Sequence, residues 1–224
     1  MPFASGHSRA QWVSILLALV VALDIVAVVS DYMQIQLFNR ALAGETITLA
    51  EATANDSRQA AIGGIYLVLF IITAILFLMW IHRAHRNLPS FRIEGLQYSP
   101  RWAVGGFFVP FLNLVRPFQV TKEIWKASDP TTDIADSVAW QSAPTSPIII
   151  SWWLLFLISG ILGQIMLRLS LQAETLGELL TIGWLTLVTD AVDIPAAILA
   201  IMIIRNIDSR QEQKNRLLAS YVAR

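Results

Sequence analysis

Apolar residues along the chain gather in four long runs separated by shorter polar stretches. The runs extend over Trp12 to Ser30, Ala60 to Ile81, Ile148 to Leu167 and Leu180 to Ile204. A helix needs about 20 residues to cross roughly 30 Å of hydrocarbon, and each run is about that long. The first run follows Arg9, but it exceeds the apolar core of a secretory signal peptide, and no small-residue cleavage site directly follows it. We therefore predict four transmembrane helices.

A fifth apolar stretch, Trp102 to Phe118, is interrupted by residues that break helices or are costly in lipid. They are Gly105, Gly106, Pro110, Asn113, Arg116 and Pro117. If this stretch does not cross, thirteen of the sixteen Lys and Arg residues lie on the side of the N-terminus, and the other side holds only Arg40, Arg58 and Arg168. Because basic residues concentrate on the cytoplasmic side, this arrangement is favoured over a fifth crossing, which would leave six inside and ten outside. We therefore predict an interfacial or re-entrant amphipathic segment on the cytoplasmic face, with both termini cytoplasmic.

The polar segments complete one membrane domain over residues 1–224. The expected parts are spans at 12–30, 60–81, 148–167 and 180–204, an interfacial collar at 82–127, a linker at 128–147 and a cytoplasmic tail at 205–224. The tail is predicted to continue the last helix. The outer connections, 31–59 and 172–178, are too short for a folded extracellular domain, although residues 31–42 have room to extend the first helix by about three turns.

Composition supports a membrane protein and removes several other classes. Hydrophobic residues make up 55% of the 224 positions and charged residues 14%, which is too apolar for a water-covered surface. Sixteen Lys and Arg residues against sixteen Asp and Glu residues give a formal charge of zero, which offers no support for a nucleic-acid partner. The absence of cysteine excludes disulfides, thiolate nucleophiles and cysteine-ligated metals.

The stretch that joins the second apolar run to the linker carries a long ordered motif. It contains W-x-x-R-A-x-x-N-L at 80–88, S-P-x-W-A-V-G at 99–105, P-x-x-N-L-x-x-P at 110–117 and E-I-W-K-A-S at 123–128. With RNIDSRQ after the last run, this string resembles the bacterial membrane family known as domain of unknown function 4328. The resemblance implies a multi-pass protein of the bacterial cytoplasmic (inner) membrane and implies no biochemical role. His82 departs from the resemblance, so no histidine role follows from it.

Aromatic and basic side chains in and beside the collar are candidate contacts for lipid headgroups or for a partner protein. Tryptophan rings prefer the headgroup layer, and basic groups pair with lipid phosphates. The candidates are Trp80, Arg83, Arg86, Trp102, Arg116, Lys122, Trp125 and Lys126. The alternative is a structural anchor that only fixes the second helix against the inner leaflet.

Three acidic residues lie within the apolar runs, where an ionisable group costs about 2.5 to 3.5 kcal/mol. Counted at about 1.5 Å per residue from the cytoplasmic ends of their helices, Asp24 lies about 18 Å deep, and Asp193 and Asp190 lie about 17 and 21 Å deep. Asp190 and Asp193 share a helix face, and Pro195 leaves the carbonyl of Ala191 free beside them. This layer predicts an ion or proton site, structural hydrogen bonds between helices, or pairing with a partner subunit.

No catalytic or cofactor motif accompanies these features. The sequence contains no P-loop, G-x-S-x-G, H-E-x-x-H or dinucleotide-binding pattern. His82 and His85 have helical spacing but lack a third ligand, so we predict no metal and no cofactor. We expect a non-enzymatic scaffold or accessory subunit whose partners are the lipid bilayer and other membrane subunits or further copies of the chain. The alternative is a small proton- or cation-coupled transporter or channel that uses Asp24, Asp190 and Asp193.

Overall fold

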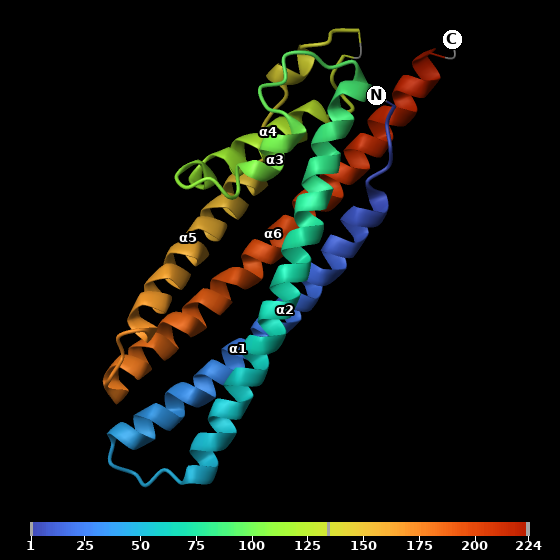
Figure 1. Cartoon of the computed structure of the whole chain (residues 1–224). Helices are drawn as coiled ribbons and strands as arrows, with labels where there is room; N and C mark the ends of the chain where they lie inside the picture. The colour runs from blue at the N-terminus through green and yellow to red at the C-terminus, as the bar shows by residue number, and fades with distance from the viewer. Residues whose placement is uncertain (1, 134, 223–224) are drawn as a thin grey trace. The chain divides into compact units, whose positions relative to one another are not determined.

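The structure is a computed structural model that describes residues 2–133 and 135–222, and all regular elements in these ranges are helices. Figure 1 shows four long helices, α1 (His7–Leu42), α2 (Leu49–Asn87), α5 (Pro147–Ser170) and α6 (Leu176–Val222). Each is long and apolar enough to cross a membrane, which confirms the predicted all-α fold with four transmembrane helices. The shorter helices are η1 (Leu88–Phe91), α3 (Pro100–Gly105), η2 (Leu112–Leu114), α4 (Arg116–Ala127) and η3 (Ala139–Ser142).

The chain forms two compact units, and each long helix contributes residues to both. Unit 1 consists of Met1–Leu16, Thr73–Trp153 and Leu199–Arg224, and unit 2 consists of Leu17–Ile72 and Leu154–Ile198. The collar and the linker belong to unit 1, whereas the three acids of the apolar runs belong to unit 2. The two groups of candidate site residues are therefore in different units.

The connection between α1 and α2 is much shorter than the sequence pattern predicts. Helices cover most of the connection expected at 31–59, because α1 continues to Leu42, the extension for which the sequence has room, and α2 already begins at Leu49. The added turns contain several Ala, Leu and Gln residues, which are good helix formers. Only residues 43–48 remain outside the two helices.

A capping box starts α2 and explains why the chain can turn so tightly. Glu51 Oε2 accepts a 2.9 Å hydrogen bond from the Thr48 amide, and the Thr48 hydroxyl accepts one of 3.2 Å from the Glu51 amide. The reciprocal bonds satisfy amide groups that a helix start leaves without intrahelical partners. The same Thr-x-x-Glu arrangement, formed by Thr175 and Glu178, starts α6.

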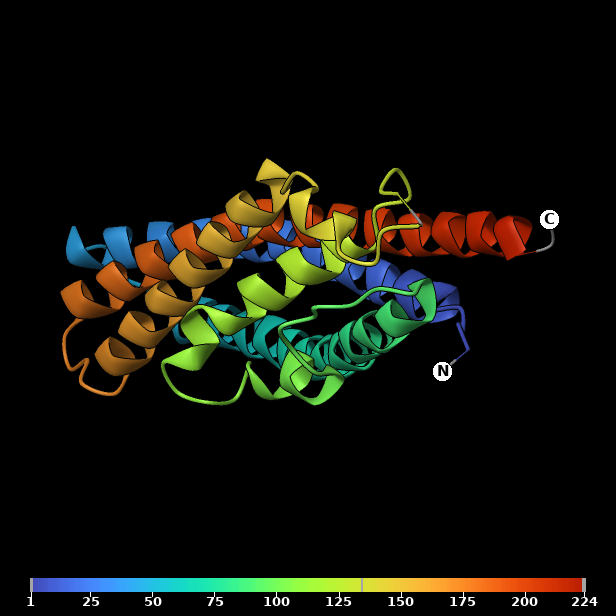
Figure 2. The same cartoon turned by 90° about the horizontal axis from the view of Figure 1, so that it is seen from above.

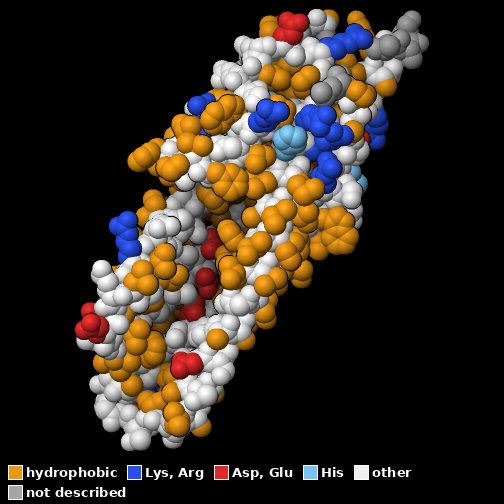
Figure 3. Space-filling model, in the orientation of Figure 1, with side chains coloured by type: hydrophobic (Ala, Val, Ile, Leu, Met, Phe, Trp, Pro, Cys, Tyr) orange, Lys and Arg blue, Asp and Glu red, His pale blue; other side chains and the backbone are white. Residues whose placement is uncertain are grey.

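Unit 2 turns large apolar side chains outward. Ile65, Leu67 and Val68 of α2 are between 54% and 59% exposed, and Figure 3 shows apolar side chains along its helices. Inside the unit, Ile35 of α1 is fully buried, and a side chain at Gly183 of α6 would come within 3.3 Å of it. A small residue at this position lets the two helices approach closely. The apolar exterior suits contact with lipid.

Unit 1 is built around apolar side chains from α2, α4 and α6. Ile81, Ile124, Ile204 and Ile207 are each 0% exposed. Full burial of one such side chain stabilises a protein by about 1.5–3 kcal/mol relative to its exposure. The amphipathic helix α4 is therefore packed into the core of the unit.

Residues 102–118 do not form one straight helix. α3 ends at Gly105, the chain turns through 106–115, and α4 begins at Arg116. Figures 1 and 2 both show this reversal. Pro117 lies in the first turn of α4, where its missing N–H is tolerated. The helix-breaking glycines and prolines thus divide this stretch into two short helices joined by a turn.

The 128–147 linker is held against the rest of unit 1. Lys214 of α6 donates 3.0 Å hydrogen bonds through Nζ to the carbonyl oxygens of Ala127 and Asp129. Trp140 of η3 is buried, and its Nε1 donates a 2.9 Å hydrogen bond to a backbone carbonyl. The tail continues α6 as far as Val222, as predicted. Its side chain at Lys214 holds the start of the linker in place.

Candidate functional site

Four aspartates meet in unit 2, two from α1 and two from α6. Asp24 and Asp31 are seven residues apart, and Asp190 and Asp193 are three apart, so each pair lies on one face of its helix. Asp190 interacts electrostatically with all three of the others. Figure 3 shows acidic side chains within a hollow of this unit. The structure therefore brings together the three acids singled out in the sequence and adds Asp31.

Asp24 is completely buried and has no hydrogen bond. It is 0% exposed, and neither carboxylate oxygen has a partner among the described residues. The nearby charges that act on it are the like charges of Asp193 and Asp190. An ionised carboxylate in such surroundings costs several kcal/mol, on the order of what other buried unpaired charges cost. A protonated, uncharged carboxyl avoids this cost.

The carboxyl groups of Asp31 on α1 and Asp190 on α6 lie close enough to interact with each other. Carboxylate oxygens only accept, so a hydrogen bond between two carboxyl groups requires that one of them carries a proton. Asp31 is 2% exposed, which keeps water from taking over this contact. A direct hydrogen bond between α1 and α6 at this point therefore requires that one of the two carboxyl groups is protonated.

Asp193 differs from the other three because hydroxyl groups surround it. The side chains of Ser159 on α5 and Tyr66 on α2 both interact with its carboxyl. A hydroxyl can donate to an ionised carboxylate, which stabilises the charge. Thr186 and Thr189 of α6 instead donate to carbonyl oxygens of their own helix, at 2.9 and 2.8 Å. The polar contacts thus give the four acids unequal surroundings.

A chain of hydrogen bonds leads from Asp31 along α1 and α2. Gln59 Nε2 donates to Asp31 Oδ1 at 3.2 Å, and Ser30 Oγ donates to Gln59 Oε1 at 3.3 Å. Arg58 Nε donates to Ser30 Oγ at 2.8 Å, and Arg58 Nη2 donates to Asn55 Oδ1 at 2.7 Å. The positive charge of Arg58 also acts on the carboxyl of Asp31. The carboxyl cluster therefore continues into a polar path.

Asp31, Gln59 and Arg58 are missed at the level of sequence because the predicted helices stop at Ser30 and start at Ala60. One signal points to Asp31, namely its spacing of two helical turns from Asp24. No pattern identifies Gln59 and Arg58, because their contact with Asp31 depends on how α2 packs against α1.

No three His, Cys, Asp or Glu side chains of the described residues are grouped so as to hold a metal ion. His85 instead places Nε2 at 3.0 Å from Glu123 Oε1, and both side chains are buried. Glu123 Oε2 also accepts a 2.6 Å hydrogen bond from the Gln97 amide. Since a carboxylate accepts only, Nε2 is the nitrogen of His85 that carries the proton. This contact ties α4 to α2.

Two of the predicted headgroup contacts lie inside unit 1. Trp80 is 2% exposed, with its ring centroid 5.6 Å from that of Phe77. Trp125 is 5% exposed, and the guanidinium of Arg210 lies 4.0 Å above its ring. These indole rings therefore stabilise the unit and offer little surface to lipid.

The other predicted headgroup contacts keep part of their surface. Arg86 and Trp102 are exposed, and the half-buried ones are Arg83, Arg116, Lys122 and Lys126. The Arg116 guanidinium lies 4.9 Å from the ring centroid of Tyr98, and Lys126 Nζ donates a 2.9 Å hydrogen bond to the Gln141 carbonyl. Arg83 and Arg86 leave the same helix one after the other, and they define the basic surface of unit 1.

Residues 43–209 match the family described as a domain of unknown function, DUF4328. The chain belongs to the DUF4328 family. The match covers parts of both units and includes two of the four aspartates, Asp190 and Asp193, whereas Asp24 and Asp31 lie before it. No curated protein and no solved structure matches the chain.

The motif by which the chain resembles DUF4328 proteins has a structural explanation in unit 1. Asn87 Nδ2 donates to Gln211 Oε1 at 3.1 Å, and Gln211 Nε2 donates to Ser128 Oγ at 3.0 Å and to the Ala84 carbonyl at 2.8 Å. Ser99 caps α3 by accepting a bond from a backbone amide. Motif residues thus join α2, the end of α4 and α6, while the acidic residues of unit 2 lie outside the motif.

Proposed function

We propose that this DUF4328 protein is a proton-coupled transporter or channel of the bacterial inner membrane, with the four aspartates of unit 2 as its proton site. The observation that carries the proposal is Asp24, which is fully buried and has no hydrogen-bond partner among the described residues. Intramembrane acids without a structural partner are typical of proton pathways. Asp190, which interacts electrostatically with both Asp24 and Asp31, offers a nearby carboxyl group to receive or supply that proton.

The proposed pathway uses protons, because the buried carboxyl of Asp24 has no hydrogen-bond partner among the described residues and can take up a proton in place of a charge. A proton needs only one acceptor atom at a time, and the carboxyl groups of Asp24, Asp193, Asp31 and Asp190 offer a series of such atoms. The hydrogen-bonded chain through Gln59 and Ser30 gives the series a polar continuation. We infer no catalytic role for any of these residues.

Proton flux into proteoliposomes tests this proposal. Purified protein is reconstituted with a pH-sensitive dye inside the vesicles, and a potassium gradient with valinomycin sets a negative internal potential. We expect wild-type protein to acidify the lumen and Asp24→Asn and Asp190→Asn to reduce the rate at least tenfold. Glu174→Gln removes an exposed acid of the same unit and should keep the wild-type rate. Absence of flux in the wild type contradicts the proposal.

A second candidate is a non-enzymatic scaffold or accessory subunit that docks through the turn between α3 and α4. Phe108 and Phe111 in this turn are 68% and 84% exposed, and Phe111 has a φ of 63°. A bulky residue in the left-handed region costs about 1–3 kcal/mol, and such strain gathers at functional sites. The exposed rings offer an apolar contact to another membrane subunit or to a further copy of the chain.

Gentle detergent extraction followed by mass spectrometry tests the second candidate. A partner chain in fixed stoichiometry with the wild type should be lost from Phe108→Ser and Phe111→Ser. Phe3→Ser, which changes a ring that packs on Phe91, is the control. A partner that all variants retain, or a wild-type protein without one, contradicts docking through this turn.

A further inference from the structure

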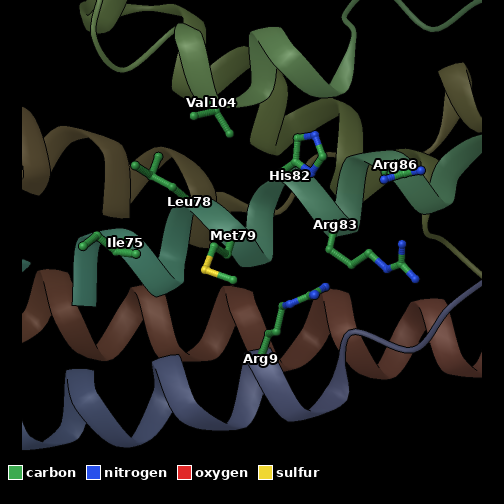
Figure 4. Close-up of a pocket in the computed structure, with 8 residues that line it drawn as sticks. All are labelled: Arg9, Ile75, Leu78, Met79, His82, Arg83, Arg86 and Val104. Atoms are coloured by element: carbon green, nitrogen blue, oxygen red, sulfur yellow. The ribbon is translucent and has the colours of Figure 1, made fainter. Parts of the chain in front are cut away.

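Unit 1 contains a pocket of about 410 Å³ between α1, α2 and α3 that combines a basic end with an apolar end. Figure 4 shows Arg9 of α1 extending toward Arg83, with Arg86 and His82 beside them on α2. No acidic residue lines the pocket, so its three guanidinium groups leave it with a net positive charge. Its occupant is therefore expected to carry negative charge.

The arginines of this pocket are largely free to bind a ligand. Arg9 and Arg86 are exposed and make no hydrogen bond or ion pair with any described residue, while Arg83 donates through Nε only to the Ala4 carbonyl, at 3.2 Å. The three guanidinium groups are close enough for Arg9 and Arg86 to repel Arg83. Guanidinium groups bind phosphate oxygens through two parallel hydrogen bonds, and a bound phosphate offsets this repulsion.

The other end of the pocket is lined by apolar side chains. Ile75, Leu78 and Met79 occupy the preceding turns of α2, within its apolar run, and Val104 of α3 faces them (Figure 4). A free phosphate ion would use only the basic end. A molecule that joins a phosphate to a hydrocarbon chain fills both ends, with its chain directed along the apolar part of α2.

We propose that this pocket binds one anionic phospholipid, with its phosphate on Arg9, Arg83 and Arg86 and an acyl chain along Ile75 and Met79. The order of basic and apolar side chains along α2 matches the order of headgroup and chain in a bilayer leaflet. The site involves neither the aspartates of unit 2 nor the turn at Phe111, so it is independent of both proposed functions.

Lipid titration of the delipidated protein in a nonionic detergent tests the site. The thermal unfolding midpoint and native mass spectra are recorded with dioctanoyl phosphatidylglycerol, dioctanoyl phosphatidylcholine and inorganic phosphate. We expect phosphatidylglycerol to raise the midpoint and to form a complex of one lipid per chain, because a ligand that binds the folded state stabilises it. The same response to phosphatidylcholine or to inorganic phosphate would overturn the proposal.

Two variants connect this response to the pocket. Arg86→Gln and Arg9→Gln remove guanidinium groups that are exposed and make no hydrogen bond or ion pair with the described residues, so both proteins should fold. Each should need at least tenfold more phosphatidylglycerol for the same rise of the midpoint. Arg205→Gln is the matched control, since Arg205 is exposed just after the apolar run of α6 and lies outside the pocket. Equal loss in all three variants would show nonspecific charge attraction and overturn the site.

Discussion

Glu123 is buried in unit 1 and connects α4 to two other parts of the chain. Its carboxylate accepts hydrogen bonds from α2 and from the loop that precedes α3. Its oxygens meet His85 Nε2 at 3.0 Å and the Gln97 amide at 2.6 Å. Glu123→Ala leaves the buried His85 Nε2 without an acceptor, and an unsatisfied buried group costs about 1–3 kcal/mol. We expect a clearly lower thermal unfolding midpoint in detergent. Glu94→Ala, at an exposed position, should leave it unchanged, and an equal loss in both would contradict this role.

Asp129 gives unit 1 a sensitivity to acid. Burial tends to raise the pKa of its carboxyl, but the amide and hydroxyl of Thr131, with the charges of Arg210 and Lys214, hold that pKa below its ordinary value of 3.8. The stabilisation that the ionised carboxyl of Asp129 gives to the folded protein is therefore complete above pH 3.8. It is lost as the pH falls through the lower pKa that this carboxyl has in the folded state.

The pH dependence of unfolding checks this effect. Between pH 5 and about pH 3, the unfolding midpoint of the wild type should fall more steeply than that of Asp129→Asn, which cannot titrate. Near neutral pH, the unfolding midpoints of the two proteins should change with pH in the same way. Parallel curves over the whole range would show that Asp129 contributes no acid-sensitive stability.

Single residues differ in how far their surroundings could be foreseen. Asp24, Asp190 and Asp193 stand out because charge is rare within apolar runs. Trp80 does not reveal its burial, since an interfacial tryptophan and a core tryptophan occur in the same sequence context. Packing between helices decides which group a buried polar side chain contacts. The periodicity of a single helix does not reveal that contact.

Gly106 allows α3 and α4 to meet at their shared turn. A Cβ at this position would lie 2.7 Å from Cγ of Arg116 and 3.1 Å from the carbonyl oxygen of Trp102. Gly106→Ala must therefore displace a backbone or the start of α4, at a cost of about 1–3 kcal/mol. Gly105→Ala is the matched control, because its Cβ would stay 3.8 Å from the nearest atom.

Thermal unfolding of the two glycine variants distinguishes them. Gly106→Ala should unfold at a lower temperature than the wild type, whereas Gly105→Ala should be neutral or slightly more stable, since alanine favours helix over glycine. Unchanged stability of Gly106→Ala would mean that the turn can relax around a methyl group.

Whole helices follow from the sequence more reliably than their ends do. Four apolar runs suffice to identify α1, α2, α5 and α6, because the cost of exposing polar backbone in lipid leaves helices as the spanning form. Hydropathy cannot show that α1 reaches Leu42, since polar residues form helices equally well outside lipid. The capping boxes at Thr48 and Thr175 are the local signals that mark where α2 and α6 begin.

The orientation of the whole molecule remains a prediction from its uneven distribution of basic residues. The chain has no cysteine, so single cysteines can report on each side without background. In spheroplasts, Thr46→Cys should react with a membrane-impermeant maleimide, because it lies in the connection between α1 and α2. Ser220→Cys should react only after permeabilisation. The opposite pattern would reverse the predicted topology.

The complete burial of Asp24 also has a kinetic consequence. Without exposure or a hydrogen-bond partner among the described residues, its carboxyl can gain or lose a proton only through a neighbouring carboxyl or during a brief opening of the helices. Its exchange after a sudden pH jump should therefore be slow, and the infrared band of a protonated carboxyl should change in a delayed phase that Asp24→Asn lacks. The rate of that phase would measure how often unit 2 opens.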